Sequence, residues 1–157
     1  MNYPITKMPG KKFPIKPPVF GAIYLLIAFL VNHYFRYTII QKPYTYFGII
    51  IIFAGFFLLF RGAYLFRTSK TPIVPGEKPK FMIQKWPYTF SRNPIYLGMG
   101  FILSGIFVCF GKAALIIAPI LFFITIRMIF IPFEEKLMAK TFGKKYLDYR
   151  KRVRRWI

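Results

Sequence analysis

The residues best suited to chemistry in this chain are a few acids and one arginine set in an apolar run. Aspartate and glutamate occur only four times, at Glu77, Glu134, Glu135 and Asp148. Glu134 follows Arg127 by seven residues, which is about two turns of an α-helix and roughly 10 Å along one face. If this run crosses a membrane, the arginine and the acidic pair are functional candidates. The alternatives are that the acids only neutralise nearby lysines and that Arg127 extends towards the membrane surface.

A second polar group occupies residues 91–98, with the sequence Ser-Arg-Asn-Pro-Ile-Tyr-Leu-Gly. Asn93 can cap a helix and Pro94 suits the first helical position, so we expect a helix to begin here. Arg92 would then lie just outside the helix start, with its planar guanidinium available to a carboxylate or a phosphate. The unpaired N–H groups of the helix start would point the same way, and Tyr96 would face the same region. A plain helix start is the alternative.

Composition excludes several other kinds of site. A single cysteine, Cys109, rules out a disulfide framework and a multi-thiolate metal site. A single histidine, His33, rules out a histidine-rich metal centre and makes a Ser-His-Asp triad improbable. We therefore predict no metal site. The formal net charge of +20 would normally suggest nucleic-acid binding, but the distribution of the charges argues against it.

Four runs are nearly free of charge, at residues 17–35, 43–60, 93–111 and 113–133, and Arg127 is the one charge within them. A transmembrane helix needs roughly 20 mostly apolar residues. The runs predict an all-α integral membrane protein, one domain over residues 1–157, with four transmembrane helices near 18–36, 46–64, 94–110 and 113–133. Four buried helices in a soluble domain are the alternative, which this short chain makes improbable. No cleavage-type sequence follows the first lysines, so we expect no removable signal peptide.

Lysine and arginine alternate between the two sides of these spans. Four precede the first span, two follow it, seven lie at 61–92, one separates the last two spans, and ten run from Arg127 to the end. The positive-inside rule then predicts that both termini and the segment 61–92 are cytoplasmic, with any active site on that face. The same charges predict contact with anionic membrane lipids. Nucleic acid becomes a remote possibility.

Glycines and prolines predict further details of the spans. Gly98, Gly100 and Gly105 would allow a neighbouring helix or a ligand to approach the third span closely. Pro119 should kink the fourth span, and Pro132 should mark its cytoplasmic end. The segment 61–92 contains several aromatic residues, so we expect an ordered loop that stays close to the membrane interface.

The tail from residue 134 to 157 is amphipathic. Its apolar residues recur at helical spacing, namely Met138, Phe142, Tyr146, Tyr149, Val153 and Trp156. This pattern predicts a C-terminal amphipathic interfacial helix that Gly143 bends or splits. Because the tail follows the acidic pair directly, its apolar side could cover a pocket at the mouths of the third and fourth spans.

These motifs together resemble one known family. They are Pro87, Tyr88, Phe90 and residues 91–98; Ile131, Pro132, Glu134, Glu135 and Leu137; and Phe142, Gly143, Tyr146, Tyr149, Val153, Arg155 and Trp156. In this order, over residues 71–157, they resemble the isoprenylcysteine carboxyl methyltransferases and their phospholipid methyltransferase relatives. The first two spans match only in hydropathy. Asn93 stands where the prenylcysteine enzymes typically carry histidine, which weakens the transfer of their substrate to this chain.

The resemblance implies a methyltransferase that uses S-adenosylmethionine (AdoMet) and acts on a lipophilic or membrane-embedded acceptor. The cofactor-binding residues implied are Tyr88, Arg92, Asn93, Pro94, Tyr96, Gly98, Glu134 and Glu135. With the arginine of the fourth span, the candidate catalytic residues are Arg92, Arg127 and Glu134. AdoMet offers an ammonium and a ribose diol to a carboxylate, and its own carboxylate to an arginine. Which glutamate takes which group stays open, as does the acceptor atom.

Two other classes of function are considered. A sterol-reductase-like membrane enzyme that uses NADPH should need a longer chain with more spans than 157 residues provide. A non-catalytic cationic membrane protein that binds anionic lipid or a partner helix would need neither cofactor. Cofactor binding distinguishes the three classes.

Overall fold

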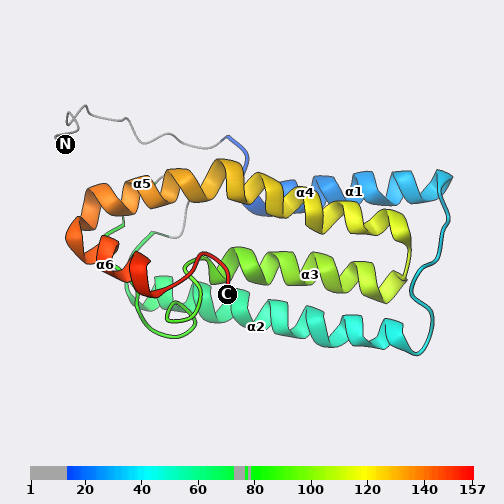
Figure 1. The fold of residues 1–157 in the computed structure, drawn as a ribbon, viewed down its shortest axis with the longest axis horizontal. Helices are drawn as coiled ribbons and strands as arrows, with labels where there is room; N and C mark the ends of the chain where they lie inside the picture. The colour runs from blue at the N-terminus through cyan, green and yellow to red at the C-terminus, as the bar shows by residue number, and fades with distance from the viewer. Residues whose placement is uncertain (1–13, 73–76, 78) are drawn as a thin grey trace.

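The computed structural model describes residues 14–72, 77 and 79–157, and these residues form helices joined by turns and loops, without a β-sheet. The lysines before Lys16 lie outside the described residues. Four long helical columns run side by side, and the C-terminal tail and the loop before α3 gather at one end (Figure 1). The elements are α1 (Pro17–Tyr34), η1 (Tyr44–Tyr46), α2 (Phe47–Thr68), α3 (Pro94–Phe110), η2 (Ala113–Ile116), α4 (Ile117–Thr125), η3 (Ile126–Phe130), α5 (Ile131–Phe142) and α6 (Lys144–Arg152).

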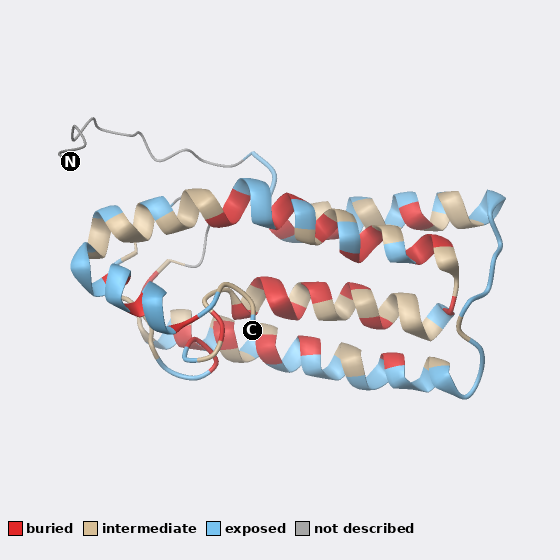
Figure 2. Cartoon of the chain, viewed as in Figure 1, coloured by how far each residue is buried: buried red, intermediate tan, exposed pale blue. Residues whose placement is uncertain are grey.

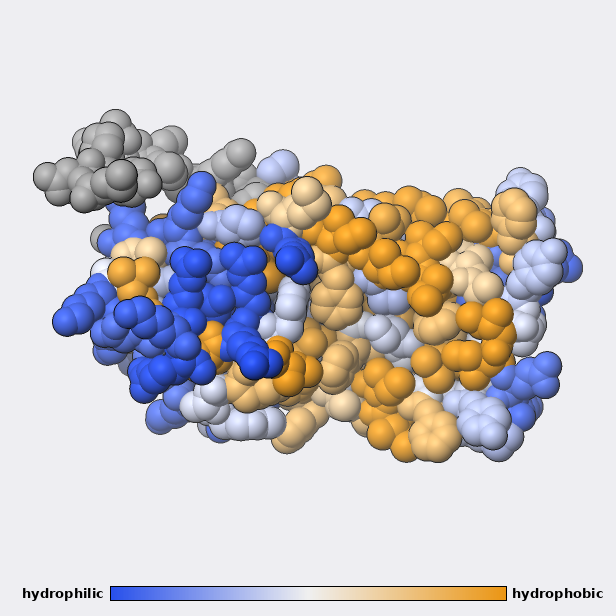
Figure 3. Space-filling view, viewed as in Figure 1, coloured by the Kyte–Doolittle hydropathy of each residue, from blue (hydrophilic) through white to orange (hydrophobic). Residues whose placement is uncertain are grey.

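The four predicted spans are all helical. Three stretches are long and apolar enough to cross a membrane, namely Pro17–Tyr34, Tyr44–Thr68 and Ala113–Phe142, and α3 is a shorter apolar helix of 17 residues. The outward side of α2 consists of large apolar side chains such as Ile50, Phe53 and Phe57, which are 64 %, 70 % and 61 % exposed. Apolar side chains cover the surface along the helices, whereas hydrophilic side chains gather at the end that holds the tail (Figure 3). The chain is an all-α integral membrane protein, as predicted.

Glycines set the distance between α2 and α3. A Cβ atom on Gly98 would lie 2.6 Å from the carbonyl oxygen of Gly55, and one on Gly105 would lie 2.7 Å from that of Gly48. The two backbones are therefore in contact, which only small residues permit. Gly100 instead faces the Phe123 ring of α4. The close approach predicted for the glycines of α3 is thus made by neighbouring helices.

Burial follows this packing. Buried residues concentrate on α3 and α4, while much of α1 and α2 is exposed on the outside of the bundle (Figure 2). One cluster of buried apolar side chains joins α3 to the fourth column through Tyr96, Leu103, Phe122 and Phe130. Because lipid tails are as apolar as these side chains, van der Waals packing rather than transfer out of water holds such a cluster together.

The helical column does not end at Pro132, the residue predicted to mark the cytoplasmic end of the fourth span. The column continues through α5 to Phe142 (Figure 1). A π-helical turn, η3, precedes Pro132, and such turns accommodate a break in the regular hydrogen-bond ladder. Pro119 lies in the first turn of α4, which directly follows the 3₁₀ turn η2. The proline therefore lies where the chain changes from 3₁₀ to α-helix. The whole column has 30 residues and a length of about 45 Å. Because the hydrocarbon core is only about 30 Å thick, α5 extends beyond it.

The amphipathic tail is helical, and Gly143 splits it into α5 and α6. Gly143 has φ 52° and ψ −129°, a conformation that side chains disfavour. The apolar side of α6 contributes Tyr146 and Tyr149, which cluster with Val153 against Met82 and Phe142. This side therefore contacts the protein itself.

Candidate functional site

Two adjoining cavities lie at the end of the bundle that holds the tail. The first, which we name the loop-side cavity, contains about 800 Å³ of empty space, part of it open to solvent. Its lining comes from the loop before α3, from α5 and from α6. The second, the helix-side cavity, has about 830 Å³ of such space and is lined by the start of α1 and by α3. Five residues line both cavities, namely Phe66, Tyr88, Arg92, Asn93 and Glu134.

Local structure positions Arg92 at this junction. Pro94 is the first residue of α3, as predicted, and it is buried. The backbone N–H of Arg92 donates a hydrogen bond to the backbone carbonyl of Arg154 at 2.9 Å. The tail therefore pairs with the segment that leads into α3. The Asn93 amide nitrogen donates to the Arg155 carbonyl at 3.0 Å and makes no cap of α3, so the predicted capping role of this side chain is wrong. The tail holds this side chain through its nitrogen, whereas a helix cap would use its oxygen as the acceptor.

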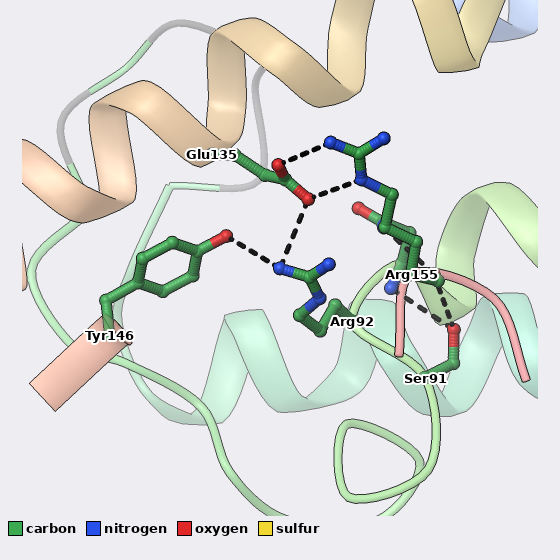
Figure 4. A network of polar contacts seen from close by, with 6 residues as sticks. Ser91, Arg92, Glu135, Tyr146 and Arg155 are labelled. Carbon is green, nitrogen blue, oxygen red and sulfur yellow. Dashed lines mark hydrogen bonds and ion pairs between the residues drawn. The ribbon is translucent and has the colours of Figure 1, made fainter. Parts of the chain in front are cut away.

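Glu135 is the centre of an ion network (Figure 4). Arg155 donates from Nε and Nη2 to the two carboxylate oxygens, each at 2.8 Å. Arg92 reaches one of these oxygens from Nη1 at 3.2 Å and donates a long hydrogen bond of 3.5 Å to the Tyr146 hydroxyl. The hydrogen bonds to Glu135 raise the pKa of the Arg155 guanidinium, which therefore stays charged. Two arginines thus neutralise Glu135.

Glu134 has a different environment from its neighbour. Its Oε1 accepts a hydrogen bond of 2.6 Å from the Tyr96 hydroxyl. Among the described residues, no cationic side chain forms an ion pair with it. It lines both cavities. Glu134 is therefore the carboxylate that remains available to a cationic or hydroxyl-bearing ligand.

Buried tyrosines enclose the loop-side cavity. The Tyr149 hydroxyl donates to the Tyr88 carbonyl at 2.7 Å, which ties α6 to the loop. Burial raises the pKa of both phenols, and the charge of Glu134 raises that of Tyr88 further. Both phenols therefore remain neutral at physiological pH, and the proton of Tyr149 is used in the bond to the Tyr88 carbonyl.

Two of the candidate residues lie away from the cavities. Gly98 packs on Gly55 of α2 and lines neither cavity. Arg127 is exposed and also lines neither cavity. The expectation that Arg127 and Glu134 share a face is wrong, because the π-helical turn Ile126–Phe130 takes more residues per turn than the α-helix assumed. Six candidates do line at least one cavity, namely Tyr88, Arg92, Asn93, Tyr96, Glu134 and Glu135, and the buried Pro94 is their immediate neighbour.

Sequence reasoning did not include Tyr146 and Arg155 among the site residues. Both stand in the C-terminal signature, so the signal was present, but their contact with Arg92 and Glu135 crosses 20 to 54 positions of sequence. Phe66 at the end of α2 carried no signal at all. Among the described residues, no cluster of histidine, cysteine and acidic side chains could hold a metal ion.

The fold and the cavities define an integral membrane protein with a charged site at one end of its helix bundle. The second cavity shares the charged wall and adds apolar side chains such as Ile95 and Met99. The chain belongs to the phospholipid methyltransferase family: the model of that family matches residues 44–145, more than half of the chain. Membership implies methyltransferase activity. Comparisons with curated proteins and with solved structures find no match.

The family match includes α2, α3, Arg92 and both glutamates, and it ends one residue before Tyr146. The first helix and the tail segment with Arg155 therefore lie outside it. The matched family is that of the phospholipid methyltransferases. The resemblance to the isoprenylcysteine carboxyl methyltransferases receives no separate support.

Proposed function

We propose that this protein is an AdoMet-dependent methyltransferase whose acceptor is a lipophilic molecule of the membrane. The observation that carries the proposal is the wall shared by the two cavities, because it contains both Arg92 and Glu134. A donor in the loop-side cavity and an acceptor in the helix-side cavity would meet at this wall. Opposite charges on the wall suit a zwitterionic amino-acid group.

The residues present fit the chemistry of AdoMet. Arg92 has a side chain only 9 % exposed, and its buried Nε has no hydrogen-bond partner among the described residues. A buried donor without an acceptor costs free energy, which a ligand carboxylate would offset. Glu134 would accept hydrogen bonds from an ammonium or a ribose diol. Phe66 and Tyr88 offer ring surfaces to a base.

The two glutamates then have different roles. Glu135 is already engaged by Arg155 and Arg92, so a further cation would gain little from it. Glu134 has only the Tyr96 hydroxyl as a partner among the described side chains. We therefore assign the direct contact with the cofactor to Glu134, whereas Glu135 pairs mainly with Arg155.

The chemistry requires little more from the protein than position and exclusion of water. AdoMet, when bound, supplies a methyl group on a sulfonium, which a nucleophile displaces directly. Arg92 and Glu134 would fix one reactant, and the apolar side chains of Ile95 and Met99 in the helix-side cavity would hold the other. Correct alignment of two reactants accounts for a large part of such rate enhancements. No serine, cysteine or histidine nucleophile is required.

The proposal assigns the cavity end to the cytoplasm. The exposed lysines and arginines of α5, α6 and the tail gather there, among them Lys136, Lys144, Lys145, Lys151 and Arg154 (Figure 3). Positive charge near a span favours the cytoplasmic side, and anionic headgroups attract it. The basic surface would therefore hold α6 against anionic lipids while its apolar side covers the loop-side cavity.

The test is transfer of labelled methyl from AdoMet into host lipid and small-molecule extracts by the detergent-purified protein, followed by identification of the product. We expect label in a lipophilic product. In parallel, calorimetry measures the binding of AdoMet and of NADPH. Binding of NADPH without AdoMet would support a reductase instead, and binding of neither would support a non-catalytic lipid-binding role.

A further inference from the structure

Glu135 is shared unequally between two arginines (Figure 4). Arg155 takes both carboxylate oxygens at 2.8 Å, whereas Arg92 reaches one oxygen at 3.2 Å. Bidentate guanidinium–carboxylate pairs are the stronger and more directional kind. Glu135 is therefore held mainly by Arg155, and only part of the hydrogen-bonding capacity of Arg92 is used by the protein.

The backbone of the tail fixes Arg155 in this position. Its carbonyl accepts hydrogen bonds from Ser91 Oγ at 3.2 Å and from the Asn93 amide at 3.0 Å. The neighbouring Trp156 packs edge-to-face on Phe123 of α4, with ring centroids 5.2 Å apart. Arg155 thus contacts the segment before α3 through its backbone and α5 through its side chain. These contacts tie together three segments that are far apart in the sequence.

We propose that Arg155 is a positioning residue of the AdoMet site: it occupies Glu135 and so keeps the Arg92 guanidinium available for the carboxylate of the cofactor. This inference rests on the proposed function. Without Arg155, the nearest cation to Glu135 is Arg92. The carboxylate of Glu135 would then compete with the carboxylate of the ligand for the same N–H donors. Removal of Arg155 harms the site through Glu135, so removal of both residues is less harmful than removal of Arg155 alone.

The experiment compares AdoMet affinity by calorimetry for the parent and for Arg155→Gln, Arg155→Lys, Glu135→Gln and the double variant Arg155→Gln/Glu135→Gln. We expect Arg155→Gln to weaken AdoMet about tenfold, the lower end for a lost hydrogen bond to a charged group. Arg155→Lys keeps the positive charge but lacks the planar guanidinium that binds both carboxylate oxygens. Its AdoMet affinity should lie between that of Arg155→Gln and that of the parent. The double variant should recover to within about threefold of the parent, as should Glu135→Gln.

Arg152→Gln is the matched control, because Arg152 is an exposed arginine three positions earlier that donates a long hydrogen bond to the Asp148 carbonyl of its own helix. It should bind AdoMet as the parent does. Elution and melting temperature in detergent establish that each variant is folded. If Arg155→Gln fails to fold, the same test is made with Arg155→Lys, which should bind AdoMet more weakly than Glu135→Gln does.

Three results would overturn the inference. One is an Arg155→Gln variant that binds AdoMet as the parent does. Another is a double variant weaker than Arg155→Gln, which would show a merely structural role for the tail. The third is Glu135→Gln weaker than Arg155→Gln, which would make Glu135 a direct ligand. Failure of the parent itself to bind AdoMet would instead refute the proposed function, and this inference with it.

Discussion

Substitution of Glu134 by glutamine separates the two acids of the site. Glutamine has the same shape and keeps an oxygen that can accept the 2.6 Å hydrogen bond from Tyr96, so the packing of α3 against α5 should persist. What is lost is the negative charge at the wall of both cavities. The substitution therefore tests ligand binding with little effect on the fold.

The size of the effect follows from the contact that is lost. Among the described residues, Glu134 has no cationic partner, so its charge is free to engage the ammonium or the ribose diol of AdoMet. A hydrogen bond to a charged group contributes about 1.5–3 kcal/mol. Since about 1.4 kcal/mol corresponds to a factor of ten, Glu134→Gln should weaken AdoMet roughly ten- to a hundredfold.

Calorimetry with AdoMet on the detergent-purified variants is the assay. Asp148→Asn is the control, because it removes the same charge from an exposed position on α6, and it should leave the affinity unchanged. The reasoning is refuted if Glu134→Gln binds AdoMet as the parent does. If Glu134→Gln binds AdoMet normally but needs a higher concentration of the acceptor for activity, Glu134 contacts the acceptor instead of the cofactor.

Further predictions concern the arginine, the tail and the topology. Arg92→Lys keeps a positive charge but loses the planar fork, so AdoMet affinity should fall about tenfold or more in the same assay; an unchanged affinity would exclude a bidentate grip by Arg92. Truncation after Lys140 removes Tyr146, Tyr149 and Arg155 and should give a protein that is inserted in membranes but transfers no methyl group; full activity would make the tail a mere anchor. Cysteines introduced at positions 77 and 157, with Cys109 replaced by serine, should react with an impermeant thiol reagent only from the cytoplasmic side; labelling of both from outside would invert the topology.

Much of the fold could be predicted because the information is local. Each span is a continuous apolar run, and hydropathy over about 20 residues does not depend on which helices become neighbours. The start of α3 at Pro94 and the break at Gly143 are also local, since each follows from the backbone preference of one residue. The glycines of α3 indicated close packing, although not that α2 would be the partner of Gly98 and Gly105.

The errors arose where local rules meet tertiary packing. Pro132 ends a helix only if its break cannot be absorbed, and the π-helical turn Ile126–Phe130 absorbs it. The same turn moves Arg127 away from the face of Glu134. Asn93 is a favourable cap by type, but its side chain is bonded to the carbonyl of Arg155, 62 positions later, and makes no cap of α3. Intervening geometry and distant competitors of this kind leave no trace in the spacing of residues.

By itself, the sequence determined an all-α membrane protein, and it singled out Arg92, Glu134 and Glu135 as chemically useful. The tertiary structure decided how these three differ. Glu135 is neutralised because the tail brings Arg155 to it, whereas Glu134 meets only Tyr96 among the described side chains and stays available to a ligand. The physical reason is that the energy of a charge depends on the charges within a few ångströms of it. In this protein those charges come from segments far apart along the chain.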